Sequence, residues 1–159
     1  MLKDNDIKFI ADDMLGRLAK WLRILGYDII YYRSINNKEL MALANLENRT
    51  LLTRDTDITS SGKAHNCILI ENDNYKEQLK QVLGLLSMRI QKQKIFSRCL
   101  ICNESLKPIN RNDVMGKVPP FVFETQDEFV ACCKCSKIYW KGTHSSRVEE
   151  IIRKVFDSD

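Results

Sequence analysis

Carboxylates stand at two places where an apolar stretch gives way to a polar one, and together they could bind a divalent cation. Asp12 ends the stretch at residues 7–12, Asp55 ends another at residues 50–55, and Asp57 follows two residues later. Carboxylate oxygens are hard ligands that favour Mg²⁺ or Mn²⁺. A cation bound in this way would assist phosphodiester hydrolysis by activating water and neutralising charge on the phosphate oxygens.

Each of these acids also has a purely structural interpretation. Asp12 or Asp13 could cap the helix that follows, and Asp55 could begin a turn. Glu39 is a weaker candidate for a ligand, because Asn36 lies three residues before it and the two form an ordinary capping box. The joint placement of the acids at strand ends nevertheless favours a site.

Basic residues near the acids could hold the phosphates of a polyanion. Arg17, Lys20 and Arg23 form a helical stripe, which in most proteins is solvated rather than bound to substrate. Asp13 and Arg17 also have the i, i+4 spacing of a helical ion pair. The formal net charge of +4 suits contact with polyanions without proving it. Arg17, Lys20 and Arg54 are therefore candidate substrate-binding residues.

Four of the six cysteines form two pairs with the spacing of a zinc knuckle. Cys99 and Cys102 form one pair, and Cys132 and Cys135 form the other. Two such pairs provide the tetrahedral Cys₄ site of a structural zinc, which a small module with little apolar mass needs in order to fold. Cys133 could replace Cys132, although its spacing to Cys135 is poorer, and the alternative to a metal site is a set of free buried thiols.

Strands that alternate with helices should position the acids. Hydrophobic patterning predicts strands over residues 7–12, 28–32, 50–55 and 66–72, and helices from residue 13 up to a C-terminal cap at Gly26 and over residues 37–47 and 75–88. This alternation predicts an α/β fold with an open, mainly parallel sheet and helices on both faces. Because ligands bind beyond the carboxyl ends of parallel strands, Asp12, Asp55 and Asp57 should share one edge of the sheet.

A different pattern begins at residue 97, where short apolar pieces are separated by Cys, Asn, Pro and Gly. Short strands are predicted within residues 117–123 and 128–140, and an amphipathic helix over residues 146–156. We therefore expect two domains, residues 1–90 and residues 91–159, of which the second is a zinc ribbon with the terminal helix. Its Trp140 could stack on a base of single-stranded RNA, or it could pack into a core.

No apolar run approaches the roughly 20 residues of a membrane span, and the charged start of the chain does not resemble a signal peptide. Paired CxxC motifs in a sequence without a signal peptide or membrane span are typical of a cytoplasmic protein. In the cytoplasm, cysteines stay reduced and more often hold metal than form disulfides. The sequence therefore predicts a cytoplasmic protein without membrane contact.

Four segments resemble the Mut-seven C-terminal RNase domain family, a PIN-like nuclease domain with an appended zinc ribbon: "FIADDMLGRLAKWLRILGYD", "LLTRD", "SRCLICN" and "CSKIYWKGTH". The resemblance implies a PIN-like sheet with strand order 2-1-3-4, in which Asp12 and Asp55 lie on neighbouring strands, and cleavage of RNA with Mg²⁺ or Mn²⁺. Related sequences usually carry an acid where this chain has Asn37, so that Glu39 is the nearest carboxylate and the middle ligand is weakened.

The leading interpretation is a metal-dependent ribonuclease with Asp12 and Asp55 as principal metal ligands and Asp57 and Glu39 as auxiliary ones. One alternative is a non-catalytic adaptor that binds RNA or the ribosome and has a degenerate acidic site. Another is a structural interaction protein without a nucleic-acid partner. Divalent-metal binding at the acids separates the first from the other two, and salt-dependent RNA affinity separates the adaptor from the structural protein.

Overall fold

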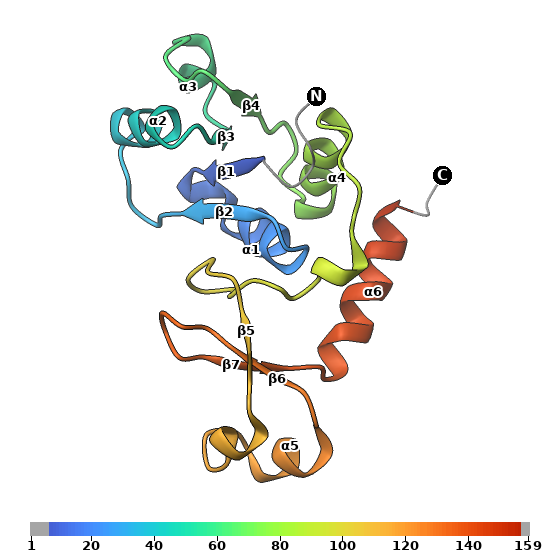
Figure 1. Ribbon diagram of the computed structural model, residues 1–159. Helices are drawn as coiled ribbons and strands as arrows, with labels where there is room; N and C mark the ends of the chain where they lie inside the picture. Colours follow the sequence, from blue (N-terminus) through green and yellow to red (C-terminus); the bar gives the residue numbers. More distant parts are fainter. Residues whose placement is uncertain (1–6, 157–159) are drawn as a thin grey trace. The chain divides into compact units, whose positions relative to one another are not determined.

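The computed structural model describes residues 7–156, apart from the side chains of residues 143 and 144. The chain forms two compact units, of which the first ends at Asn103 and the second begins at Glu104 (Figure 1). The domain boundary predicted after residue 90 lies within the first unit, and the first cysteine pair lies in the same unit.

A four-stranded parallel sheet forms the centre of the first unit. Ile10 lies opposite Ile30 on one neighbouring strand and Leu51 on the other, which defines the register. The expected α/β fold with a parallel sheet is confirmed, as is the strand order. The strands are β1 (Lys8–Ala11), β2 (Asp28–Tyr31), β3 (Thr50–Thr53) and β4 (Cys67–Leu69), and they are arranged in the order β2-β1-β3-β4.

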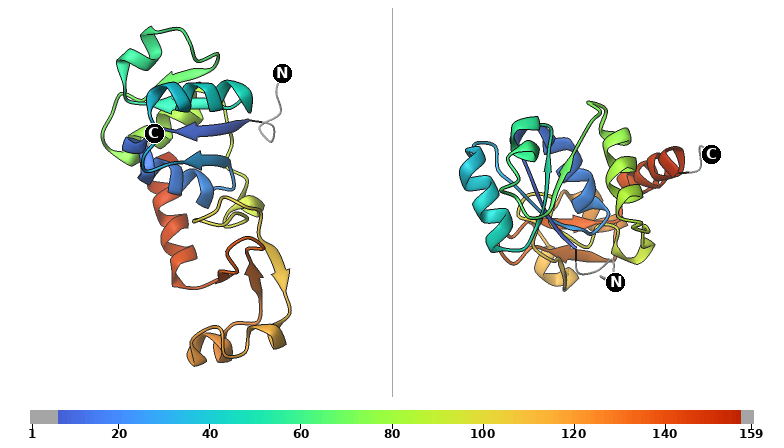
Figure 2. Two further views of the ribbon diagram at one scale, coloured as in Figure 1. Left: turned by 90° about the vertical axis from the view of Figure 1, so that its left-hand side faces the viewer. Right: turned by 90° about the horizontal axis from the view of Figure 1, so that it is seen from above.

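Helices cover both faces of this sheet. They are α1 (Gly16–Ile24), α2 (Asn37–Leu46), α3 (Thr56–Ser60) and α4 (Tyr75–Leu85), with short 3-10 turns η1 (Asp13–Leu15) and η2 (Lys92–Lys94). Figure 2 shows α1 and α4 on one face and α2 and α3 on the other. The sequence pattern predicted α1, α2 and α4. It missed α3, which begins where the Asp55 side chain caps the chain.

Apolar side chains fill the space between the sheet and its helices. On the α2 and α3 face, Ile10 and Leu51 pack with a buried group from the two helices, Leu40, Ala44 and Ile58. Full burial of a Leu or Ile side chain contributes about 1.5–3 kcal/mol relative to leaving it exposed. The strands that end at Asp12 and Asp55 are therefore held firmly along their length.

Gly26 follows α1 at a position where a side chain does not fit. Its φ of 89° lies in the left-handed region, as predicted for a helix C-terminal cap, and a Cβ there would lie 2.5 Å from the Lys94 carbonyl oxygen. This close approach lets the segment around η2 run against the end of α1, where the Phe96 N–H donates to the Ile24 carbonyl at 2.8 Å.

The second unit contains a small antiparallel sheet with strand order β5-β6-β7. The strands β6 and β7 form a hairpin within residues 128–140, as predicted, and α6 includes the predicted helix over residues 146–156. In the part of the chain that the structure describes, no helix is both long enough and apolar enough to cross a membrane. The elements are β5 (Lys107–Ile109), η3 (Arg111–Val114), α5 (Pro120–Thr125), β6 (Phe129–Ala131), β7 (Ile138–Trp140) and α6 (Thr143–Phe156).

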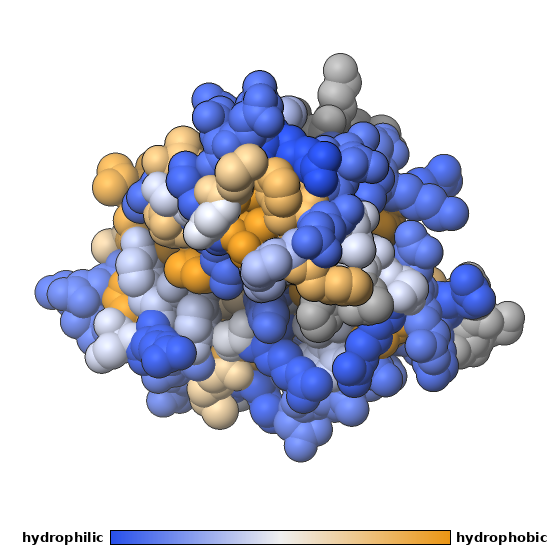
Figure 3. Space-filling view, turned by 90° about the horizontal axis from the view of Figure 1, so that it is seen from below, coloured by the Kyte–Doolittle hydropathy of each residue, from blue (hydrophilic) through white to orange (hydrophobic). Residues whose placement is uncertain are grey.

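The strand predicted within residues 117–123 is wrong, because most of this segment belongs to α5. Pro120 is the first residue of that helix, where its fixed φ favours the helical conformation and its missing N–H costs nothing. Arg111 holds the segment in place: its Nη2 donates to the Phe123 carbonyl at 2.6 Å, and its guanidinium lies 4.6 Å from the centre of the Phe123 ring. Met115 and Phe121 remain exposed, and Figure 3, a view from the side on which α5 lies in Figure 1, shows hydrophobic residues gathered among hydrophilic ones.

Candidate functional site

Asp12 lies directly after β1 and is only 6% exposed. Three protein groups donate hydrogen bonds to its carboxylate. The Met14 N–H donates to Oδ1 at 3.0 Å, whereas the Thr53 hydroxyl and the Arg54 N–H donate to Oδ2 at 2.5 and 2.9 Å. The bond to Met14 makes Asp12 the N-cap of η1, so its capping role and its position at the sheet edge occur together. Such bonds fix the orientation of the carboxylate.

Asp55 lies after β3, the strand that pairs with β1. Its Oδ1 accepts a hydrogen bond from the Asp57 N–H at 2.8 Å, and its Oδ2 accepts one from the Asn37 side-chain amide at 2.8 Å. These two bonds, the one from the Asp57 backbone first, hold the pKa of Asp55 below its ordinary value of 3.8. Asp55 is therefore a carboxylate at neutral pH.

Thr53 connects the two acids. Its buried hydroxyl donates to Asp12 and accepts a hydrogen bond from the Asp55 N–H at 3.0 Å. One side chain therefore binds the Asp12 carboxylate and the backbone of Asp55, beyond the ends of adjacent strands. We call the group formed by Asp12, Asp55, Thr53 and Asn37 the acid edge. The sequence analysis missed Thr53, and a hydroxyl residue two positions before an acid at a strand end is the signal that could have indicated it.

The acid edge fits a weakly held, well-hydrated cation. A carboxylate offers about four acceptor positions, of which Asp12 uses three and Asp55 uses two for protein donors. Mg²⁺ is usually bound through one or two carboxylates and keeps several of its waters. Among the described residues, Asp12, Asp55 and Asp57 do not form a group of three ligand atoms close enough to enclose an ion.

The auxiliary acids are placed differently. Asp57 and Glu39 are exposed in the first turns of α3 and α2. The Asp57 N–H donates to the capping side chain of Asp55, and the Glu39 N–H donates to the capping side chain of Asn36. The structure brings Asn37, rather than Glu39, into contact with Asp55. Either acid would act on a cation at the acid edge through water rather than as a principal ligand.

The ion pair predicted between Asp13 and Arg17 is wrong. No ion pair of the described residues joins them, and the Arg17 guanidinium instead lies over the ring of Tyr75, 4.0 Å from its centre. Trp21, one turn further along α1, stacks on the same ring with a centroid distance of 5.6 Å and an interplanar angle of 18°. A cation–π contact at an exposed position contributes about 0.5–1 kcal/mol. An ion pair between Arg17 and an exposed acid such as Asp13 would contribute a similarly small free energy, so the contact with Tyr75 can replace it.

The other candidate substrate-binding residues lie on separate elements. Lys20 is exposed on α1, and Arg54 is half-buried beside the acid edge, where its backbone binds Asp12. Trp140 at the end of β7 is 38% exposed, so it is not a core residue of the second unit. The neighbouring Lys141 is also exposed, and its ammonium lies 4.0 Å from the Glu128 carboxylate. The Lys137 ammonium lies 5.7 Å from the centre of the Tyr139 ring.

The sulfur atoms of the two cysteine pairs lie close together. Those of Cys99, Cys102, Cys132 and Cys135 are all within 4.8 Å of one another, and Cys133 is not part of the group. Tetrahedral zinc with Zn–S bonds of about 2.3 Å places its sulfur ligands about 3.8 Å apart. The cluster therefore has the donor set and the spacing that a zinc ribbon requires.

The two pairs share one backbone conformation. In each pair the residue after the second cysteine, Asn103 or Ser136, has a positive φ of 65° or 60°. The N–H of this residue donates to the carbonyl of the first cysteine, Cys99 or Cys132, at 2.9 Å in both cases. This repeated turn indicates two knuckles of the same kind.

The first knuckle is tied to the sheet of its own unit by long-range hydrogen bonds. Arg23 of α1 is 8% exposed and donates to the carbonyl of Ile29 at 3.1 Å and to those of Leu100 and Ile101 at 2.9 and 3.1 Å. The side chain of Asn103 accepts from the Ile29 N–H at 3.1 Å. The knuckle therefore extends the hydrogen bonding of the outer strand β2.

Asp28 links this knuckle to the centre of the sheet. Its Oδ1 accepts from Arg49 at 2.7 Å and from the Asn103 amide at 2.8 Å, and Arg49 also donates to the Phe9 carbonyl of β1 at 3.1 Å. Burial opposes ionisation of Asp28, but the hydrogen bonds from Arg49 and Asn103 outweigh it and lower the pKa below 3.8. Arg23 thus belongs to a structural network rather than to a substrate-binding stripe.

Comparison with known proteins identifies similar sequences. The Mut7-C RNAse domain family matches residues 7–152. Among individual proteins, "Exonuclease mut-7" of Caenorhabditis elegans is 25% identical over 122 residues, an alignment that covers 66% of this chain and 13% of that protein. The chain therefore spans only a small part of the length of the curated relative that it matches.

Proposed function

The chain belongs to the Mut7-C RNAse domain family, and from this premise we propose that it is a ribonuclease that hydrolyses RNA phosphodiester bonds with Mg²⁺ or Mn²⁺. The observation that carries the proposal is the acid edge, where Asp12 and Asp55 follow two adjacent strands and Thr53 bonds both the Asp12 carboxylate and the Asp55 backbone N–H. Similarity to an exonuclease supports the same class of reaction.

The position of each residue in the structure suggests its role in the proposed reaction. Asp12 and Asp55 would hold the cation, and the Asp57 N–H and the Asn37 amide orient the Asp55 carboxylate through hydrogen bonds of 2.8 Å each. When bound, such an ion lowers the pKa of its water and neutralises charge on the phosphate oxygens. Asp57 and Glu39 would contribute through water, and Arg17, Lys20 and Arg54 would hold phosphates of the substrate, each as a cation beside a polyanion.

The cysteine cluster has a structural role in this proposal. One Zn²⁺ held by the four thiolates would stabilise the ribbon that the sequence assigns to residues 91–159, because a small module with few buried apolar residues gains its folding free energy from the metal. The exposed aromatic ring of Trp140 would provide a stacking surface for single-stranded RNA.

A second function is favoured by one specific observation: protein donors occupy three of the about four acceptor positions of Asp12, and the amide of Asn37 binds Asp55 where related sequences usually carry an acid. A site with so few remaining acceptor positions could serve a non-catalytic RNA- or ribosome-binding adaptor. Such an adaptor would bind RNA with a strong dependence on salt and would leave the RNA intact in the presence of Mn²⁺.

Cleavage of pooled RNA by the zinc-loaded protein tests the proposal. We expect cleavage with Mn²⁺ present and none without added divalent metal, and we expect the Asp55→Asn variant, prepared in the same way, to be inactive. Equal cleavage by the native protein and by Asp55→Asn would identify a contaminating nuclease and reject the activity. RNA binding without cleavage in either protein would support the adaptor.

A further inference from the structure

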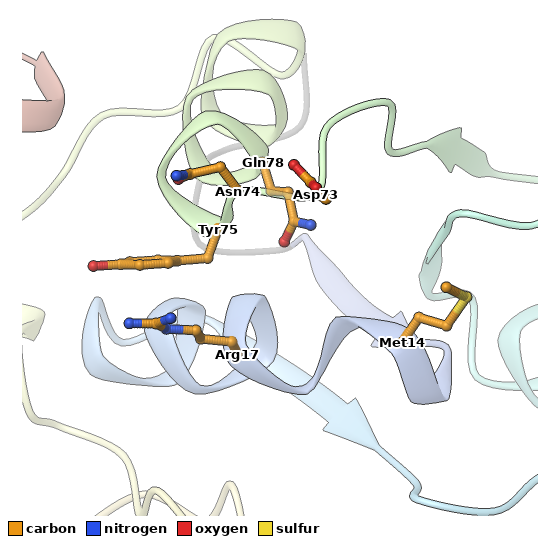
Figure 4. A pocket seen from close by; sticks show the side chains of 6 residues that line it. All are labelled: Met14, Arg17, Asp73, Asn74, Tyr75 and Gln78. Carbon is orange, nitrogen blue, oxygen red and sulfur yellow. The ribbon is translucent and has the colours of Figure 1, made fainter.

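A pocket of about 330 Å³ lies within the first unit, between the start of α1 and the start of α4. Figure 4 shows the six side chains that line it. Met14 and Arg17 come from η1 and α1, whereas the others come from the loop before α4 and from its first turn. The lining residues are Met14, Arg17, Asp73, Asn74, Tyr75 and Gln78.

The pocket is a neighbour of the acid edge. Met14 forms one of its walls, and the N–H of the same residue binds the Asp12 carboxylate at 3.0 Å. The loop that carries Asp73 follows β4, which pairs with β3, the strand that ends at Asp55. The pocket and the acid edge therefore share Met14 and lie beyond neighbouring strands of one sheet.

Arg17 gives the pocket a cation in a fixed position. The Tyr75 ring covers its guanidinium at 4.0 Å, and Trp21 stacks on the same ring. The guanidinium makes no hydrogen bond or ion pair with any residue in the described part of the chain. Its N–H donors are therefore available to an anion, and a guanidinium suits a phosphate in particular.

The inner part of the pocket presents hydrogen-bond acceptors. Gln78 is 96% buried, since only 4% of it is exposed, and its Nε2 donates to the Asn72 carbonyl at 2.8 Å, which leaves Oε1 as the other polar atom of the amide. Within residues 7–156, no group donates to this oxygen. In Figure 4 the oxygen points toward α1, into the space between the two helices. Because this oxygen is not one of the buried side-chain atoms without a partner, it is open to solvent from the pocket, and a donor on a ligand could bind it in place of water.

Asp73 adds a second acceptor, because its carboxylate lines the same pocket and is exposed. The remaining walls are apolar or aromatic, the Met14 side chain and the Tyr75 ring. The pocket therefore combines a cation for a phosphate, flat and apolar surfaces for a ring, and two acceptors for donors on that ring. These are the features with which proteins hold an unstacked nucleotide.

We propose that this pocket is a nucleotide subsite, which binds the RNA residue next to the scissile phosphate and selects bases that carry an exocyclic amino group. The identity of the ligand as RNA rests on the proposed function. Adenine, cytosine and guanine each offer an amino group that can donate to Gln78 Oε1 and to Asp73. Uracil has carbonyl oxygens on both sides of its single N–H donor, and these would face the two acceptors.

Nucleotide binding without a catalytic metal tests the proposal separately from the nuclease activity. The zinc-loaded full chain is titrated with AMP, CMP, GMP and UMP in buffer without added Mg²⁺ or Mn²⁺, and binding is followed by the NMR signals of the backbone and of the Gln78 amide. We expect shifts at Tyr75 and Gln78 and at least about fivefold weaker binding of UMP, as expected for loss of one good base contact.

Three variants assign the contacts. Asp73→Asn replaces an acceptor and should reduce the preference for AMP, CMP and GMP over UMP. Arg17→Met removes the phosphate contact and should weaken the binding of all four nucleotides by a similar factor. Glu77→Gln is the matched control, an exposed acid on α4 outside the pocket, and should bind as the native protein does. All three positions are exposed, so folding should be retained, and the melting temperature verifies this.

Equal affinity for UMP, an unchanged preference in Asp73→Asn, or no binding at millimolar concentrations would each overturn the subsite. None of these results would affect the nuclease proposal, because the titration needs no catalytic metal. Conversely, base-selective binding by a protein that does not cleave RNA would retain the pocket as a nucleotide site and reject the nuclease.

Discussion

Replacing Arg23 by methionine should destabilise the first unit and loosen the first cysteine knuckle. The guanidinium of this buried residue donates to the carbonyls of Ile29, Leu100 and Ile101, and so joins α1, the outer strand β2 and the knuckle. Methionine keeps most of the apolar stem but none of the donors, so the three carbonyl groups would lose a charged partner.

The size of the effect follows from these three hydrogen bonds. Each contributes about 1 kcal/mol net, and the carbonyls left behind in a largely buried place add to the cost, so the total is about 3–4 kcal/mol. For a domain of about 60–100 residues, each kcal/mol lowers the melting temperature by about 4–8 °C. We therefore expect the first unit of Arg23→Met to melt about 12–32 °C below the native protein.

Thermal unfolding followed by circular dichroism measures this effect, and a zinc-sensitive dye measures metal release at a fixed temperature. Arg33→Met is the matched control, because Arg33 is an exposed arginine just beyond β2 and its loss should change the melting temperature little. Faster zinc release is expected only for Arg23→Met. A melting temperature within a few degrees of the native value, with unchanged zinc release, would refute the reasoning.

Two further predictions concern the metal cluster and acid stability. Purified protein should contain one equivalent of zinc by metal analysis. The Cys102→Ser variant should lose this zinc, and the Cys133→Ser variant should retain it. Loss of zinc in Cys133→Ser alone would show that Cys133 is a zinc ligand. Burial raises the pKa of Asp28, but the hydrogen bonds from Arg49 and Asn103 outweigh burial and hold that pKa below its ordinary value of 3.8. The ionised carboxylate therefore stabilises the fold above its unfolded pKa of 3.8, and this stabilisation is lost as the pH falls through the lower folded pKa. Asp28→Asn should therefore be less stable at neutral pH and lose less on acidification below about pH 4, and parallel melting curves for the two proteins across this range would contradict the assignment.

The sheet could be predicted from the sequence because its two central strands, β1 and β3, are buried on both faces and its strands appear as short apolar runs. The same reasoning failed at residues 117–123, where an apolar run belongs to α5 and Pro120 decides its start. It also missed α3, a helix of five residues that depends on the cap by Asp55. Short elements such as these depend on local capping more than on hydrophobic periodicity.

The candidate site was predictable to the same extent. Strand order placed Asp12 and Asp55 on neighbouring strands, and the CxxC spacing indicated the cysteine group. The hydrogen bonds of Thr53 were not predictable, because they depend on the rotamers of side chains from two strands. The contacts of Arg23 with Leu100 were not predictable either, because they join positions 77 residues apart.

The measurement that tests the central claim most directly is the single-turnover rate of RNA cleavage, with Mn²⁺, by Asp12→Asn compared with Asp13→Asn. The two carboxylates are adjacent in sequence, but only Asp12 is bonded to Thr53 at the acid edge, whereas Asp13 is exposed. Loss of a residue that organises the metal should lower the rate at least about 100-fold in Asp12→Asn, while Asp13→Asn keeps most of the native rate. Equal loss in both folded variants, or no loss in Asp12→Asn, would contradict the account.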